Sequence, residues 1–206
     1  MYIKTLYLGA CMTNCYIVSS DNKSCVIIDP ASDAHEIISS VEKANLVPTA
    51  IFLTHGHFDH IYALPELCER YPDIKVYIHK DEEQYLRNTN LNLSPMFGES
   101  FVYGGDVITV TDGEIINEAG ISFKVMHTPG HTLGSVCYIT ENSIFSGDTL
   151  FASTIGRTDF PMGSFETILS SLKKLKNISG DYNVYPGHNA STTLEREKKY
   201  NEYMQL

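Results

Sequence analysis

The stretch Thr54-His55-Gly56-His57-Phe58-Asp59-His60 places three histidines and one aspartate within six residues, directly after a short apolar run. Imidazole and carboxylate groups are ligands that zinc, iron and manganese accept. Alternate side chains of an extended segment share one side, so we expect His55 and His57 to point the same way. Asp59 and His60 add a second pair of donors beyond the turn. Four donors this close together predict a site for two metal ions.

Size and composition are those of an ordinary globular protein. The chain has 206 residues, of which 43% are hydrophobic and 19% charged. A chain of this length can bury a full core as one unit, so we expect a single domain over residues 1–206. The net charge of -10 disfavours binding to nucleic acid or to an anionic membrane surface. This net charge does not exclude a small anionic substrate, because a bound dication dominates the local electric field.

The cysteines and the N-terminus predict a cytoplasmic protein. The five cysteines show no paired spacing and are expected to be reduced and mostly buried: Cys11, Cys15, Cys25, Cys68 and Cys137. The N-terminal residues show no charged segment followed by an apolar segment, as a signal peptide would. No apolar run approaches the roughly 18 residues that a membrane-spanning helix needs. We therefore expect no membrane partner.

Short apolar runs between turn residues dominate the chain and predict a layered α/β fold. Strands are expected over residues 2–8, 15–19, 25–28, 49–53, 74–78, 107–110, 114–117, 121–127, 136–140, 143–146 and 182–185. Helical spacing of apolar residues predicts helices over 35–44, 60–71, 80–87 and 194–203, and one that Ser164 caps and that runs to about 175. Residues 88–105 fit neither pattern.

Three further segments each place a metal-type donor in a glycine-bearing turn after an apolar strand. They are Pro129-Gly130-His131, Gly147-Asp148 and Pro186-Gly187-His188. Glycine lets the backbone turn sharply and approach a ligand closely. Each segment alone is equally consistent with an ordinary turn, but together with the first cluster they supply seven donors. These are His55, His57, Asp59, His60, His131, Asp148 and His188, enough for two metal ions that share a carboxylate.

In order and spacing, the seven donors resemble those of the metallo-β-lactamase superfamily. The resemblance runs over nearly the whole chain, from Asn14-Cys15-Tyr16 to Pro186-Gly187-His188. It implies an αββα four-layer sandwich with the metal ions at one edge of its two sheets. It also implies a first metal ion bound by His55, His57 and His131, and a second bound by Asp59, His60 and His188. Asp148 would bridge the two ions.

Within the superfamily, residues 128–132 and 146–151 look most like glyoxalase II, the hydroxyacylglutathione hydrolases. The short C-terminus resembles the bacterial form that lacks a C-terminal helical domain. Asp148 stands where the commonest class B β-lactamases carry cysteine, which argues against antibiotic hydrolysis. His57 stands where flavodiiron proteins carry glutamate, which argues against that branch.

The predicted chemistry is hydrolysis of a small-molecule thioester of glutathione or of another low-molecular-weight thiol. Two dications about 3.5–4 Å apart lower the pKa of a bridging water towards roughly 7 and stabilise the oxyanion that forms when hydroxide attacks the thioester carbonyl. Asp59 and Asp148 are the predicted catalytic carboxylates. Zinc is the preferred metal, with iron and manganese as alternatives because no thiolate ligand is present. The thiolate leaves without a general acid, so Cys137 is expected to pack in the core.

Arg157 lies in Gly156-Arg157-Thr158-Asp159 and corresponds to a basic position that contacts the glutathione moiety in glyoxalase II. A structural salt bridge with Asp159 is the alternative for this side chain. The same motif resembles persulfide dioxygenases, which would imply one iron held by His55, His131 and Asp148. Hydrolysis of another small ester or thiol conjugate is a third alternative. A metal-binding module without catalysis is disfavoured, because a structural zinc site is complete with four ligands.

Three other polar residues have simpler interpretations. His79, at the end of a predicted strand, is expected to be a structural hydrogen-bonding residue. His127 is expected in the core or on the surface rather than at a metal ion. Asp29, which closes Val26-Ile27-Ile28, either orients a ligand histidine from behind or serves a turn or helix cap.

Overall fold

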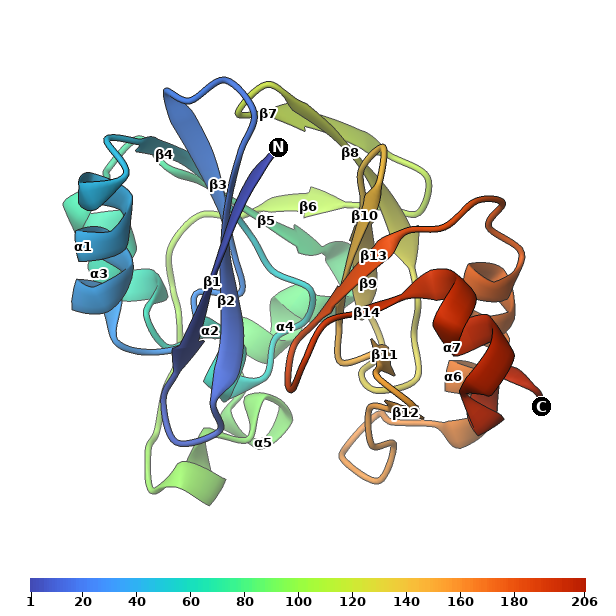
Figure 1. The fold of residues 1–206 in the computed structure, drawn as a ribbon. Helices are drawn as coiled ribbons and strands as arrows, with labels where there is room; N and C mark the ends of the chain where they lie inside the picture. Colours follow the sequence, from blue (N-terminus) through green and yellow to red (C-terminus); the bar gives the residue numbers. More distant parts are fainter.

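The computed structural model describes residues 1–206 and has two six-stranded sheets packed face to face, with helices on both outer faces. Helices α1 (Ala34–Lys43) and α3 (Leu64–Arg70) cover one sheet, and α6 (Phe165–Lys176) and α7 (Leu194–Tyr200) cover the other (Figure 1). This confirms the expected αββα sandwich. None of the helices is long and apolar enough to cross a membrane.

The N-terminal sheet has the strand order β1-β2-β3-β4-β5-β6. Its strands are β1 (Tyr2–Leu8), β2 (Thr13–Ser19), β3 (Ser24–Ile28), β4 (Val47–Phe52), β5 (Lys75–His79) and β6 (Ile108–Val110). The first three pair antiparallel as hairpins, whereas β3 to β6 run parallel. Parallel neighbours need crossover connections, and α1 and α3 supply two of them.

The C-terminal sheet has the order β14-β13-β10-β9-β8-β7. Its strands are β7 (Ile115–Glu118), β8 (Ile121–His127), β9 (Val136–Ile139), β10 (Ser143–Gly147), β13 (Asn183–Pro186) and β14 (Thr192–Thr193). A separate ribbon of β11 (Leu150–Phe151) and β12 (Thr154–Ile155) follows β10. The predicted strands are confirmed to within two residues at each end. The two-residue strands β11, β12 and β14 were not predicted, because two residues show no periodicity.

Two predicted helices are interrupted and a third ends early. The helix expected over 60–71 is split into α2 (Phe58–Ile61) and α3, because Pro65 has no backbone N–H and fits only the first turn of a new helix. Residues 80–87 form a 3₁₀ turn, η1 (Lys80–Glu82), before α4 (Glu83–Leu86). The last helix stops at Tyr200, since the Asn201 side chain caps the following 3₁₀ turn, η3 (Glu202–Met204).

The unassigned stretch 88–105 contains two short helical turns. They are α5 (Thr89–Asn92) and the 3₁₀ turn η2 (Ser94–Phe97), joined at Leu93, whose φ of 65° is left-handed. The Asn92 side chain donates a hydrogen bond to the carbonyl oxygen of Phe101 and ties the loop back on itself. Helix α6 agrees with the prediction, and its Ser164 cap accepts a hydrogen bond from the amide of Thr167 at 3.2 Å.

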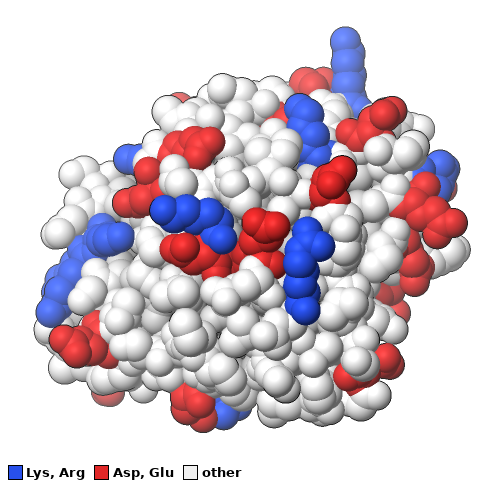
Figure 2. Space-filling view, turned by 180° about the vertical axis from the view of Figure 1, so that it is seen from behind, with Lys and Arg blue, Asp and Glu red and all other residues white.

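Aromatic side chains fill the layer between the two sheets. Phe52 is fully buried, and its ring centroid lies 4.9 Å from that of Phe123 and 4.8 Å from that of Tyr138. The Tyr138 hydroxyl donates to the carbonyl oxygen of Leu53 at 3.0 Å, which satisfies its polar end inside the core. On the face shown in Figure 2, Lys and Arg side chains alternate with Asp and Glu and form no continuous basic area.

Replacing Phe52 by alanine is expected to lower the free energy of unfolding by about 3–5 kcal/mol, because it leaves a cavity between the sheets. Urea unfolding of the metal-free protein measures the change. Phe165→Ala is the matched control, since Phe165 is 48% exposed on α6 and should cost less than roughly 0.5 kcal/mol. Equal losses in the two variants would contradict this account of the inter-sheet core.

Candidate metal centre

Four loops bring the donors to one edge of the sandwich. His55, His57, Asp59 and His60 follow β4, and His131, Asp148 and His188 follow β8, β10 and β13. Strands β10 and β13 run parallel to each other. Strand β8 shares their direction, because β8 and β10 are both antiparallel to β9. Their carboxyl ends therefore lie at the same edge of the C-terminal sheet, opposite the loop after β4.

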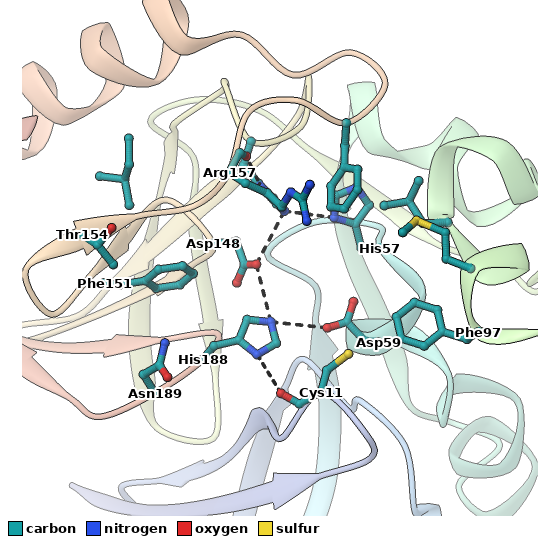
Figure 3. A pocket seen from close by; sticks show the side chains of 15 residues that line it. Cys11, His57, Asp59, Phe97, Asp148, Phe151, Thr154, Arg157, His188 and Asn189 are labelled. Carbon is teal, nitrogen blue, oxygen red and sulfur yellow. Dashed lines mark hydrogen bonds and ion pairs between the residues drawn. The ribbon is translucent and has the colours of Figure 1, made fainter.

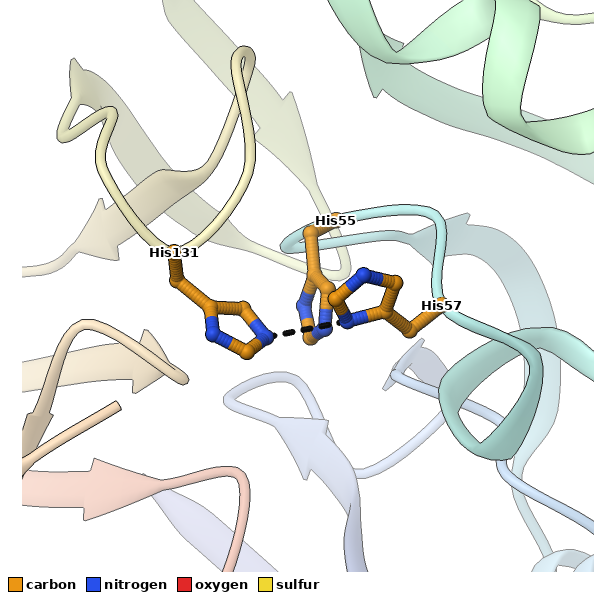
Figure 4. Close-up of side chains that lie close together, drawn as sticks. All are labelled: His55, His57 and His131. Carbon is orange, nitrogen blue, oxygen red and sulfur yellow. Dashed lines mark hydrogen bonds between the residues drawn. The ribbon is translucent and has the colours of Figure 1, made fainter. Parts of the chain in front are cut away.

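His55, His57 and His131 form the first donor group (Figure 4). The nitrogen atoms available for coordination all lie within 4.8 Å of one another, and His131 Nε2 is 2.9 Å from His57 Nδ1. His55 Nε2 is buried and has no hydrogen-bond partner. An orphaned buried nitrogen is costly unless it has an additional ligand such as a metal ion.

Asp59, His60 and His188 form the second donor group. His188 Nε2 lies 3.3 Å from His60 Nε2 and 3.3 Å from Asp59 Oδ2. The Thr13 hydroxyl donates to the same Asp59 oxygen at 3.0 Å and fixes its carboxylate. This group is more open than the first, because His188 and Asp59 are only partly buried.

Asp148 lies between the two groups. One of its oxygens, Oδ1, is 3.6 Å from His60 Nε2, and Oδ2 is 3.5 Å from both His131 Nε2 and His188 Nε2. Gly187 lets this carboxylate approach, since a Cβ at position 187 would collide with Asp148 Oδ1 and lie 2.7 Å from a carbon of the His60 ring. The structure thus brings all seven predicted donors together, with Asp148 positioned to contact both groups.

Hydrogen bonds behind the histidines set which ring nitrogen faces the site. His131 Nδ1 is 2.7 Å from the carbonyl oxygen of Arg157, and His188 Nδ1 is 3.2 Å from that of Cys11. A carbonyl oxygen only accepts, so each Nδ1 carries the proton and each Nε2 presents its lone pair to the centre. This is the tautomer that a metal ion requires.

Asp29 orients ligands of both groups from behind. Its buried carboxylate lies 3.0 Å from His60 Nδ1 and accepts hydrogen bonds from the amide and hydroxyl of Thr54 at 2.8 and 2.7 Å. The Thr54 hydroxyl gives its proton to Asp29, so it accepts from His55 Nδ1 at 3.0 Å. Of the two roles that the sequence leaves open for Asp29, these contacts favour the orientation of ligand histidines.

The charge distribution suits two dications. Burial and the neighbouring imidazoles lower the pKa of His55 and His57 well below the usual value, so both rings are neutral at pH 7. Burial also opposes charge on His60, but the carboxylates of Asp59, Asp148 and Asp29 outweigh it and raise its pKa to about 10. A field that favours a proton there also favours a metal cation, whose binding would displace that proton. Donor set, tautomers and field therefore fit the implied metal ions.

Glu82 joins two ligand loops and was not predicted. It is fully buried, and it accepts hydrogen bonds from the amides of Gly56 and Gly134, both at 2.7 Å. Burial raises the pKa of this carboxyl to about 7, although these hydrogen bonds and one to Thr132 oppose the shift. The sequence contains no signal for this role, because η1 is far from both loops along the chain.

His79 and His127 lie outside the centre. Their rings stack at 4.1 Å with an angle of 13° between planes. His79 Nδ1 accepts from the amide of Asp81, and His127 Nε2 donates to the carbonyl oxygen of Leu133. His79 Nδ1 already accepts a hydrogen bond, and the lone pairs of the two rings lie in nearly parallel planes that do not meet, so this pair is structural, in agreement with the prediction for His79.

A cavity of about 530 Å³ opens onto the donors (Figure 3). Besides ligands it is lined by Cys11, Leu93, Met96, Phe97, Phe151, Thr154, Ile155, Arg157, Phe160 and Asn189. The Arg157 guanidinium pairs with both carboxylate oxygens of Asp159, at 2.7 and 2.6 Å, and lies 4.0 Å from the centre of the Phe160 ring. The salt bridge considered from the sequence is therefore present, and Arg157 also borders the cavity.

Sequence comparison shows the family to which this architecture belongs. A family model described as the Metallo-beta-lactamase superfamily matches residues 8–188. The chain belongs to this superfamily. It is 32% identical to the hydroxyacylglutathione hydrolase GloC of Haemophilus influenzae, with 99% of this chain and 98% of that protein covered. It is 37% identical to the probable metallo-hydrolase YqgX of Bacillus subtilis, with 96% and 94% covered.

Solved structures share the fold over the whole chain. BLEG-1, described as a B3 metallo-beta-lactamase, superposes with a TM-score of 0.93 at 35% identity and 100% coverage of both chains. TTHA1623 in a di-iron-bound form gives 0.86 at 31% identity, with 98% of this chain and 100% of that chain covered. ETHE1 from Myxococcus xanthus gives 0.81 at 27% identity, with 98% and 84% covered.

Asp29→Asn is expected to weaken metal binding by roughly 10- to 100-fold, because it removes the charge that holds His60 Nδ1–H and Thr54. Titration of metal-free protein with zinc, followed by calorimetry, measures the affinity. Asp73→Asn, on an exposed residue between α3 and β5, is the control and should bind zinc like the unchanged protein. Unchanged affinity for zinc in Asp29→Asn would show that Asp29 stabilises only the local turn and does not orient the ligand histidines.

Proposed function

We propose that the protein is a metal-dependent thioester hydrolase of the hydroxyacylglutathione hydrolase (glyoxalase II) type, with two divalent metal ions. His55, His57 and His131 would hold the first ion, and Asp59, His60 and His188 the second. The observation that carries the proposal is the position of Asp148, whose carboxylate lies within 3.5–3.6 Å of nitrogen donors from both groups. The similarity to GloC supports the substrate class.

The chain's own residues provide positioning and exclude other nucleophiles. When bound, the metal ions would activate water at neutral pH and polarise the carbonyl group. Asp59 lies beside His188 in the second group, and Asp148 lies between the two groups. The Thr13 hydroxyl fixes the Asp59 carboxylate. Cys137 is fully buried in β9, which agrees with a packing role. In the metal-free protein, burial and then Asp59 and Asp148 raise the pKa of the Cys11 thiol at the cavity, which disfavours its nucleophilic thiolate form.

Arg157 is proposed to bind a carboxylate on the thiol portion of the substrate. Its guanidinium has five N–H donors, and the bidentate pair with Asp159 leaves others free. Asp159 holds the guanidinium against Phe160 and so preorganises it at the cavity wall. A carboxylate on the substrate would bind the guanidinium beside Asp159 or in its place. A negatively charged substrate would therefore bind more tightly than a neutral one.

The alternative function is a persulfide dioxygenase with one iron held by His55, His131 and Asp148, favoured by the motif Gly156-Arg157-Thr158-Asp159. Metal content and reaction type separate the two. Protein purified without chelator should contain two metal ions per chain and hydrolyse S-D-lactoylglutathione. One iron per chain, with oxygen uptake on glutathione persulfide and no thioester cleavage, would overturn the proposal. A β-lactam is a third test substrate because of the similarity to BLEG-1, and it should remain intact.

Asp148→Ala is expected to lose metal and nearly all thioester hydrolysis, because the one carboxylate that contacts both donor groups is removed. Metal content by mass spectrometry and the rate with S-D-lactoylglutathione measure the two losses. Asp73→Ala, on an exposed loop, should keep both. Normal turnover by Asp148→Ala would exclude a bridging role.

Arg157→Ala is expected to raise KM roughly tenfold with little change in kcat, since a charge-assisted hydrogen bond to the substrate tail is lost. Arg70→Ala is the matched control, because Arg70 also forms an exposed ion pair, with Glu42, but on α3 away from the cavity. Asp159→Asn, which removes the carboxylate that preorganises the guanidinium, should raise KM by a smaller factor. An unchanged KM in both Arg157→Ala and Asp159→Asn would assign the ion pair to structure only.

A further inference from the structure

A second cavity of about 220 Å³ lies beside the one that opens onto the metal ligands. Cys11, Asp59 and Phe97 line both cavities. The two cavities are therefore neighbours that share part of their lining, and Asp59 belongs both to the second donor group and to the wall of the second cavity. Nothing in the proposed function assigns an occupant to this second space.

Apolar side chains form most of its wall. Leu8 and Ala10 come from β1 and the turn after it, whereas Phe58 and Tyr62 come from α2 and its end. The Phe58 ring centroid lies 4.6 Å from that of Tyr62 and 5.3 Å from that of Phe97. Tyr62 and Phe97 remain 40% and 41% exposed. Aromatic surface that stays open to water next to an active-site cavity marks a place for an apolar ligand group.

The charged residues favour an uncharged occupant. No Lys or Arg lines the second cavity, while Asp59 and Glu99 do. In the first cavity Arg157 is the single Lys or Arg of the wall, and it is paired with Asp159. A carboxylate in the second cavity would face Glu99 and find no Lys or Arg partner, so this cavity favours an apolar group over an anionic one.

Arg157 and the residues that line both cavities lie at different ends of the first cavity (Figure 3). The backbone carbonyl of Arg157 contacts His131 of the first donor group, whereas the second cavity is lined by Asp59 of the second group. Under the proposed function, a substrate whose thiol portion reaches Arg157 and whose carbonyl lies at the centre would extend its acyl group towards Asp59 and Phe97, which line both cavities.

We propose that the second cavity binds the acyl chain and that the substrates are thioesters of extended, uncharged acyl groups. This inference rests on the proposed thioester hydrolysis and adds its substrate class. Phe97 and Tyr62 are the residues that determine specificity for chain length.

The test is a series of glutathione thioesters with acetyl, butanoyl, hexanoyl and octanoyl groups, in which the thiol portion is constant. With the metal-loaded protein, kcat/KM should rise by up to about fourfold per methylene until the cavity is full. A flat or falling kcat/KM along the series, in protein that hydrolyses the acetyl thioester, would overturn the inference.

Two matched pairs of variants localise the effect. Phe97→Ala and Tyr62→Ala should reduce the gain from acetyl to hexanoyl several-fold. Phe165→Ala and Tyr200→Ala, which alter exposed aromatic residues of α6 and α7, should keep the gain of the unchanged protein. All four side chains are at least 40% exposed, so the variants should fold, which thermal unfolding checks. A full gain in both Phe97→Ala and Tyr62→Ala would also overturn the inference.

A binding measurement separates this inference from the proposed function. Calorimetry with butanoate, hexanoate and octanoate, the acids that hydrolysis would release, requires no turnover. Binding that tightens with chain length, without hydrolysis of any thioester, would support the second cavity and refute the proposed function. Hydrolysis of the thioesters together with equal affinity for all three acids would support the proposed function and refute binding of the acyl chain in the second cavity.

Discussion

The crowding of unpaired nitrogen and oxygen donors at one edge of the sandwich is the constraint on which the rest of the structure depends. Histidines 55, 57, 60 and 131 are almost completely buried, and no protein donor satisfies the inward nitrogen of His55. Without a cation such a site costs free energy, because buried polar groups lose their hydration. The acceptors behind the rings and the carboxylates around His60 favour positive charge at the centre.

This centre also joins the two sheets. Four donors follow β4 of the N-terminal sheet, and His131, Asp148 and His188 come from the C-terminal sheet. Metal binding would therefore hold together halves that otherwise meet through the aromatic layer around Phe52 and through tertiary hydrogen bonds. Binding to the folded state alone adds to stability, so folding and metal binding would be coupled in this architecture.

Features with a local signal were predicted from the residues themselves, whereas the grouping of the seven donors was predicted from the family resemblance. Strands read from alternating or continuous apolar runs, the Ser164 cap and the short-range pair of Arg157 and Asp159 all depend on neighbouring residues. The continuous helix over 60–71 was wrong because the single Pro65 outweighs a favourable apolar spacing. Glu82 gave no signal, since its bonds to Gly56 and Gly134 join loops that only the folded chain brings together.

Specificity for one substrate would therefore be determined by residues that are not metal ligands. The donor set is compatible with several reactions of the superfamily, because two dications or one iron can occupy the same histidines and carboxylates. The walls differ in kind: η2 contributes Phe97 from a stretch with no sequence pattern, and residues 151–160 contribute Arg157 and Phe160. One wall offers a paired guanidinium and the other an aromatic surface without cations. Under the proposed thioester hydrolysis, a substrate that fits both walls would be charged at its thiol end and apolar at its acyl end, a condition that the metal ligands alone do not impose.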